Sequence, residues 1–241
     1  MARDLDSHPP ERLFLAGPAG RLGATFEMPA AAPRGAVLHL HPHPLGGGTR
    51  RNNVVRRGAL GSLEAGCAAL RFDFRGAGES DGAHDEGRGE IDDAAAALAW
   101  LAERVPGVPV FVWGFSFGSR VALDLARRRL AQAARPALAG YLGVAWPTAS
   151  YAPPRSGPWP EPMAFLAGDQ DEYVDMPALR ALAENSNAAL TVVAGAEHFF
   201  RAELDRVRAF TAGTLRVWLD AARAPDGAEA GKSGPASHDR K

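Results

Sequence analysis

The stretch "GFSFG", Gly114 to Gly118, holds one serine between two glycines where an apolar run meets a helical pattern. The run "VPVFVW" before it is typical of a buried strand, and "SRVALDLARR" after it spaces its apolar residues as a helix does. A sharp turn of this kind lifts a serine oxygen above the sheet, provided that its neighbours lack bulk. Ser116 is therefore a candidate nucleophile, and the N–H of Phe117 is placed to meet negative charge on an attacked carbonyl. The alternative is that Ser116 only caps the helix.

A serine hydroxyl needs a base that takes its proton and a third group that holds the base. Two histidines follow the serine in the chain, and His238 falls in a polar tail, which leaves His198 in "VVAGAEHFF". The loop "AFLAGDQDEYV" offers Asp169 and Asp171. Each of these residues follows a predicted strand, and their order along the chain, serine, aspartate and histidine, is the one expected of this architecture. The alternative for Asp169 is that it bends the turn through its own backbone.

Short apolar runs alternate with helical patterns along the whole chain, which predicts an α/β fold with a mostly parallel sheet of about eight strands and helices on both faces. The first two strands are expected to form an antiparallel lead-in. The predicted strands are Leu13–Gly17, Leu22–Met28, Ala36–Leu40, Ala68–Asp73, Val108–Trp113, Leu138–Val144, Met163–Ala167 and Leu190–Val193. The predicted helices are Asn53–Ala65, Glu90–Arg104, Phe117–Arg129, Met176–Asn185 and Phe199–Ala222.

The composition suits one domain over residues 13–222, with an N-terminal segment at 1–12 and a disordered tail at 223–241, because 46% of the 241 residues are hydrophobic. The net charge of −1 argues against binding to nucleic acid or to a membrane surface. Cys67 is the single cysteine, and neither a signal peptide nor a membrane span is evident. We therefore expect a cytoplasmic protein. The sequence does not determine its oligomeric state.

Four signatures resemble those of the α/β-hydrolase superfamily: "GFSFG", "GDQDEYV", "GAEHFF" and "DFRGAGESDG". The resemblance extends over nearly all of residues 13–222. More narrowly, "HLHPHPLGGGTRRNNVV" followed by "RFDFRGAGES" is similar to a small bacterial subgroup of hydrolases without a lid, related to dienelactone hydrolases and acyl esterases. In that family the acid is the second aspartate of its loop, which corresponds to Asp171.

The resemblance implies a serine hydrolase that cleaves a small acyl ester through Ser116, His198, Asp171 and an acyl-enzyme intermediate. Peptidases and thioesterases share this set of residues, so they remain alternatives. A catalytically silent protein that uses the same fold for binding is the alternative outside the enzymes. The residues that bind the substrate cannot be assigned from the sequence.

The segment "HLHPHPLGGG" departs from the superfamily, in which a histidine-glycine pair ends the third strand and the next residue supplies a second oxyanion N–H. Here that pair is His41 and Pro42. Because proline has no N–H, the matching donor is the backbone of His43, acting together with that of Phe117. Leu45 is the alternative donor.

Two further patterns suggest other chemistry. His39, His41 and His43 alternate, as metal ligands on a strand could, but no second histidine cluster follows. We expect no metal and no cofactor, and interpret His39 and His41 as partly buried side chains that bond to loop carbonyls. "DFRGAGESDG" imitates part of a dinucleotide-binding loop, but it lacks the third glycine and indicates a tight turn.

The proline-rich loop at 146–160 is too short for a helical lid, so we expect an open cleft. Its aromatic side chains, Trp146, Tyr151 and Trp159, either line that cleft or lie on the surface.

Overall fold

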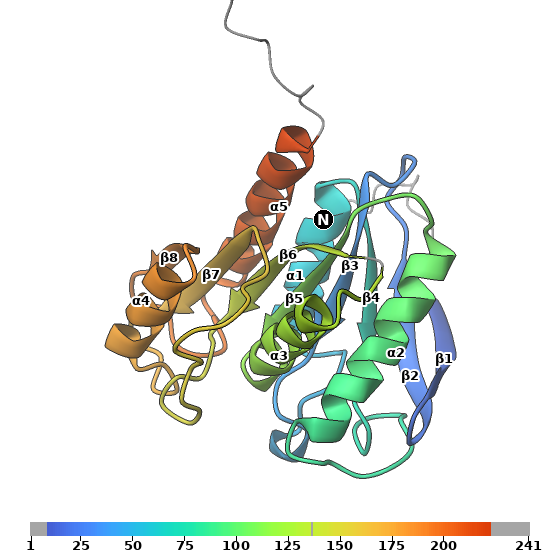
Figure 1. Cartoon of the computed structure of the whole chain (residues 1–241), viewed down its shortest axis with the longest axis horizontal. Helices are drawn as coiled ribbons and strands as arrows, with labels where there is room; N and C mark the ends of the chain where they lie inside the picture. Colours follow the sequence, from blue (N-terminus) through green and yellow to red (C-terminus); the bar gives the residue numbers. More distant parts are fainter. Residues whose placement is uncertain (1–8, 136, 223–241) are drawn as a thin grey trace, which may run out of the picture.

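A mixed sheet of eight strands forms the centre of this computed structural model, which describes residues 9–135 and 137–222 (Figure 1). The strands lie in the order β1-β2-β4-β3-β5-β6-β7-β8. β2 pairs antiparallel with β1 and β4, and every other pairing is parallel, which confirms the predicted fold class and the antiparallel lead-in. The strands are β1 (Glu11–Gly17), β2 (Gly20–Glu27), β3 (Gly35–Leu40), β4 (Cys67–Phe72), β5 (Val110–Phe115), β6 (Leu138–Val144), β7 (Met163–Gly168) and β8 (Ala189–Val193).

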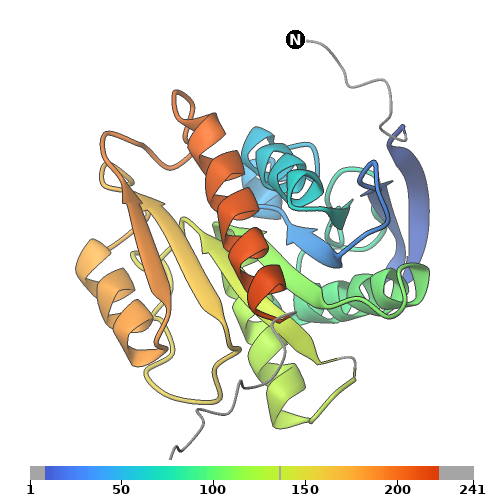
Figure 2. The same ribbon diagram turned by 90° about the horizontal axis from the view of Figure 1, so that it is seen from above.

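Helices cover both faces of the sheet, as Figure 2 shows from above. The helices are α1 (Asn53–Glu64), α2 (Arg88–Arg104), α3 (Phe117–Ala131), α4 (Met176–Asn185) and α5 (Leu204–Ala221), and a short 3₁₀ turn, η1 (Pro44–Gly46), follows β3. α1 packs against α5 on one face, while α2 packs against α3 on the other, and α4 lies beside the edge strand β8. No helix among the described residues is long and apolar enough to cross a membrane.

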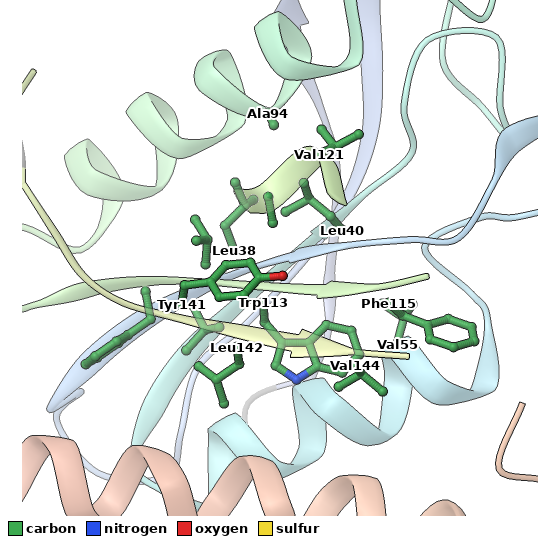
Figure 3. Close-up of a cluster of buried hydrophobic side chains, with 14 of the residues drawn as sticks. Leu38, Leu40, Val55, Ala94, Trp113, Phe115, Val121, Tyr141, Leu142 and Val144 are labelled. Atoms are coloured by element: carbon green, nitrogen blue, oxygen red, sulfur yellow. The ribbon is translucent and has the colours of Figure 1, made fainter. Parts of the chain in front are cut away.

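Side chains of the central strands alternate between two apolar layers, one on each face of the sheet (Figure 3). Trp113 on β5 reaches α5, where its Nε1–H donates to Thr211 Oγ1 at 3.1 Å. Tyr141 on β6 faces α3, and its hydroxyl donates to the Ser119 carbonyl at 2.9 Å. All of the β3, β4 and β5 residues are buried. The central strands are therefore held rigidly between the helices, and so are their carboxyl ends.

The predicted elements match the observed ones closely, with one clear difference at the last helix. The expected helix Phe199–Ala222 begins only at Leu204. Phe200 has a φ of 51°, and the Glu197 carboxylate accepts the N–H groups of Phe199 and Arg201, so these residues form a turn that apolar periodicity does not reveal. At the other end, β1 begins at Glu11 rather than Leu13. The tail predicted over 223–241 and its His238 lie outside the described residues.

Candidate active site

Ser116 occupies a sharp turn between β5 and α3, with φ 55° and ψ −123°. A positive φ is strained for a residue that carries a side chain, and such strain gathers at functional sites. The flanking glycines are required by close backbone contacts. A Cβ on Gly114 would lie 2.3 Å from the Gly118 carbonyl oxygen, and one on Gly118 would lie 2.5 Å from the carbonyl oxygens of Leu40 and His41. The turn can therefore form only because Gly114 and Gly118, two positions before and after Ser116, lack side chains.

The Ser116 side chain contacts His198 rather than the helix. It makes no capping hydrogen bond to α3, which argues against the helix-cap alternative. Its Oγ lies 2.9 Å from Nε2 of His198. Ser116 is 9% exposed and His198 is 3% exposed, so the pair is shielded from bulk water but reachable from the adjoining cavity.

The opposite side of the His198 ring faces Asp171. Nδ1 of His198 lies 2.8 Å from both carboxylate oxygens of Asp171, so we assign the ring proton to Nδ1 and leave Nε2 free to accept the serine proton. The N–H of Tyr173 donates to Asp171 Oδ1 at 2.9 Å and fixes the carboxylate. Asp169 bonds elsewhere: its Oδ1 accepts the Gly195 N–H at 2.7 Å. The imidazole therefore pairs with Asp171, and Asp169 joins two loops.

The loops after β7 and β8 are fastened to each other, which sets the position of both side chains. The Gln170 N–H donates to the Ala196 carbonyl at 3.1 Å, and the Asp169 N–H donates to the Val193 carbonyl at 3.2 Å. A Cβ on Gly168 would lie 2.1 Å from the Ala196 oxygen, so the two backbones touch. Because β5, β7 and β8 run parallel, their loops meet at one edge of the sheet, and the three predicted residues converge there.

A cavity of about 320 Å³ opens over Ser116 and His198. The residues expected to supply oxyanion donors, His43 and Phe117, both lie on its wall. Within the described parts of the chain, the backbone N–H groups of these two residues donate to no other atom. The alternative donor is committed elsewhere, because the Leu45 N–H donates to Nδ1 of His43 at 3.2 Å. The geometry therefore favours His43 over Leu45.

His41 braces the peptide that carries the His43 N–H. The Phe74 N–H donates to Nε2 of His41 at 2.9 Å, so the ring proton must lie on Nδ1, which donates to the Pro42 carbonyl at 2.6 Å. The Pro42 carbonyl and the His43 N–H belong to one peptide unit, so this bond sets the direction of that N–H. Burial lowers the pKa of His41 to about 4, and the ring is neutral at pH 7.

The three alternating histidines do not form a common site. His39 lies under α1, with Nε2 3.1 Å from the Ser62 hydroxyl, and burial lowers its pKa well below the usual value. His43 packs its ring on Phe117, with centroids 4.8 Å apart. His41 bonds to a loop carbonyl as expected, whereas His39 bonds to a hydroxyl, and both are fully rather than partly buried. Nowhere in residues 9–135 and 137–222 do three His, Cys, Asp or Glu side chains gather as metal ligands.

The glycine-rich turn after β4 surrounds the carboxylate of Asp73. Asp73 accepts the Arg50 N–H at 2.7 Å and the Glu79 N–H at 3.2 Å, and it also pairs with the Arg50 guanidinium. A Cβ on Gly78 would lie 2.1 Å from Asp73 Oδ2, so the turn wraps around this side chain. This arrangement agrees with a tight turn rather than a phosphate cradle. The role of the buried Arg50 could not be predicted from the sequence, because nothing in its neighbours along the chain indicates an acidic partner.

The aromatic residues of the 146–160 loop have three different environments. Trp146 is 2% exposed and belongs to the core, so it is neither a surface residue nor part of the cavity wall. Tyr151 lines the cavity together with Tyr173 and Phe199. Trp159 packs under the Arg127 guanidinium, 4.7 Å from the ring centroid. Tyr151 is therefore the one of the three that meets the expectation of a cleft residue.

Comparison with known proteins gives consistent matches. The profile of the α/β hydrolase fold family matches residues 47–133. An uncharacterized protein of Rickettsia prowazekii is 32% identical over 201 residues, which cover 79% of this chain and 82% of that protein. A serine hydrolase without a lid from Xanthomonas campestris has a TM-score of 0.78 and 29% identity, covering 88% of this chain and 96% of its own. An α/β serine hydrolase homologue from Coxiella burnetii has a TM-score of 0.76 and 30% identity, covering 85% and 97%.

Proposed function

The chain belongs to the α/β hydrolase fold family, and from this premise we propose that it is a serine hydrolase that cleaves small acyl esters. The observation that carries the proposal is the unbroken contact from the Ser116 hydroxyl through His198 to Asp171, which faces a cavity. A silent binding protein has no need of this contact. Two of the bacterial relatives, one named as a serine hydrolase without a lid and one as an α/β serine hydrolase homologue, support the same chemistry.

In the proposed reaction His198 Nε2 takes the hydroxyl proton while Ser116 Oγ bonds to the ester carbonyl carbon, whose oxygen gains the electron pair. Collapse of this tetrahedral intermediate breaks the bond to the leaving oxygen, and His198 returns the proton to that oxygen. The alcohol departs and the acyl group stays on Ser116. Water, deprotonated by His198, then attacks the acyl-enzyme and releases the carboxylic acid. Asp171 holds the ring tautomer and stabilises the imidazolium that forms twice per cycle.

The oxyanion is proposed to lie between the backbone N–H groups of His43 and Phe117. The first turn of α3 adds the positive end of the helix dipole at this point. His41 has a supporting role, because its bond to the Pro42 carbonyl orients the His43 N–H before substrate arrives. Donors fixed in advance avoid reorganisation during the reaction and stabilise the charge better than water does.

The cavity supports a small substrate. Its volume of about 320 Å³ is near the lower end of ligand sites, and the aromatic rings of Tyr151, Tyr173 and Phe199 border it. The short, proline-rich loop above it carries no helix among the described residues.

The lone cysteine, Cys67, is buried and free, which supports the proposed cytoplasmic location, where disulfides are rare.

The test is hydrolysis of aryl esters from acetate to octanoate by the purified protein and by matched variants. S116A is expected to lose about a millionfold in kcat, and D171N about 10⁴-fold, because the asparagine amide holds the wrong tautomer. D169N is the control: it changes the neighbouring aspartate, which bonds to Gly195 rather than to the imidazole, and is expected to stay within about threefold of the parent. Equal losses in D169N and D171N, or turnover that persists in S116A, would contradict the proposal.

A further inference from the structure

A second, wider hollow of about 720 Å³ adjoins the cavity over Ser116. His43, Ser150 and Tyr151 line both hollows, so the two lie side by side. The wider one, which we call the outer recess, is further bounded by His84, Glu86 and Arg120. His198 and the two aromatic residues in contact with it, Tyr173 and Phe199, line the cavity over Ser116 but not the outer recess. The outer recess therefore lies on the side of Ser116 that faces away from the imidazole.

This arrangement fixes which part of an ester enters the outer recess, provided that the proposed function holds. His198 must return a proton to the leaving oxygen, so the alcohol part lies beside the imidazole, near Tyr173 and Phe199. The acyl part extends from the carbonyl carbon in the opposite direction. The outer recess is thus the acyl subsite, and its side chains select the acyl group.

Arg120 is held in the wall of this recess one helical turn beyond the serine. Its N–H donates to the Ser116 carbonyl at 3.3 Å, so the two residues share a face of α3. The guanidinium is fixed by the Glu86 carbonyl at 3.2 Å, by Asp124 at 3.3 Å and by the Tyr151 ring, 4.7 Å from its centroid. In the described residues Nη2 donates to no acceptor, and the side chain remains 22% exposed. A cation fixed in this way loses little entropy when it binds a ligand.

Arg120 is the side chain of the recess that carries a permanent positive charge, and the charges of the other ionisable groups are limited as follows. Burial lowers the pKa of His43, which is therefore neutral at pH 7, and His84 Nδ1 lies 2.7 Å from the buried Glu90 carboxylate. Glu86 brings a carboxylate to the rim, but its side chain is 78% exposed and lies 3.5 Å from Arg88. Asp124, the partner of Arg120, does not line the recess. A ligand inside the recess therefore meets the guanidinium on the inner wall, with the acidic group at the solvent edge.

We propose that the acyl group of the substrate carries a carboxylate, which Arg120 binds in the outer recess. The substrate is then a monoester of a short dicarboxylic acid, cleaved at the ester by the proposed reaction. Guanidinium and carboxylate match in shape and charge, and a hydrogen bond between two charged groups is stronger than one between neutral groups.

The experiment compares esters that differ only in the terminal group: monoaryl glutarate against pentanoate and monoaryl adipate against hexanoate, with the S116A rate subtracted as background. For the parent enzyme, kcat/KM for the charged ester is expected to exceed that for its neutral match by about tenfold or more, and this advantage should fall with added NaCl. In R120Q the ratio of charged to neutral kcat/KM is expected to drop by about 10- to 100-fold, while R120K retains part of it.

R127Q is the matched control, because Arg127 also lies on α3, also packs on an aromatic ring and also donates to a backbone carbonyl, that of Ser156. Its ratio should equal that of the parent. If the parent prefers neutral esters, or if R120Q keeps the parent ratio, the inference fails while ester hydrolysis stands. If no ester is turned over at all, the proposed function itself fails. Should R120Q not fold, the salt dependence of the parent ratio still decides, since an advantage insensitive to NaCl overturns the role of a cation.

Discussion

Replacing Gly118 by alanine tests how closely the serine turn is fitted against the end of β3. The new Cβ would lie 2.5 Å from the carbonyl oxygens of Leu40 and His41, whereas ordinary contacts begin at 3.4 Å. About 0.9 Å of movement is therefore required, and both contacts are backbone, so no side chain can yield instead. Either the first turn of α3 moves, with Ser116 and the Phe117 N–H, or the end of β3 moves, with His43.

The expected result for G118A is a loss of about 100-fold in kcat for ester hydrolysis, because a displacement near 1 Å at reacting groups costs about that much. The free energy of unfolding, measured by urea denaturation, should fall by about 1–3 kcal/mol. G213A is the matched control: Gly213 also lies within a helix, but nothing comes within 4 Å of its Cβ position. Alanine there should stabilise α5 by up to about 1 kcal/mol and leave kcat unchanged.

If G118A retains the parent kcat and stability, the backbone contacts do not constrain the turn. If G213A loses kcat as well, the loss in G118A cannot be assigned to the contacts of Gly118, because replacing any helical glycine would then have the same effect. A G118A protein that stays folded, with reduced stability and reduced kcat, is the outcome that ties the fit of the turn to the reaction.

Three further predictions concern the groups that support the site. Burial lowers the pKa of His41 in the folded state from 6.5 to about 4. The parent should therefore lose about 3 kcal/mol of stability as the pH falls from 6.5 to 4. H41Q should lack this part of the loss when urea denaturation is measured over the same pH range. R50M leaves the buried Asp73 without its cation and is expected to cost about 3–5 kcal/mol, measured in the same way at pH 7. Y141F removes the bond to the Ser119 carbonyl and should cost about 1 kcal/mol by thermal unfolding, with the fold retained.

Each of these predictions has an outcome that contradicts it. For His41, the sign is fixed because the unfolded chain binds the proton more tightly, so a parent that gains stability on acidification from pH 6.5 would be inconsistent with a buried neutral ring. A stable R50M protein would mean that Asp73 is solvated or protonated without Arg50. A loss well above 3 kcal/mol in Y141F would indicate a packing role rather than one hydrogen bond.

Much of the fold could be predicted because its signals are local. Each strand is a short apolar run and each helix a periodic one, and parallel strands place their following loops at one edge. That rule brings Ser116, Asp171 and His198 together without any knowledge of distances. The start of α5 escaped prediction because Phe199 fits the apolar period of the helix, while the turn that excludes it depends on the Glu197 carboxylate and the positive φ of Phe200.

Other parts of the site depend on partners far along the chain, which a single sequence does not pair. The Phe74 N–H after β4 donates to the His41 ring after β3, and the Arg50 guanidinium forms an ion pair with the Asp73 carboxylate. The outer recess could not be predicted either. In the sequence Arg120 is an ordinary helical arginine, and its contact with Tyr151 of a distant loop appears only in the folded structure.

Activation of the Ser116 hydroxyl by His198 can be measured by covalent labelling. The protein should be incubated with a fluorophosphonate probe and its intact mass measured, followed by peptide mapping. We expect a single adduct on the peptide containing Ser116, none in S116A, and strongly slowed labelling in H198A. An accessible, folded protein that stays unlabelled, or an adduct on another residue, would contradict it.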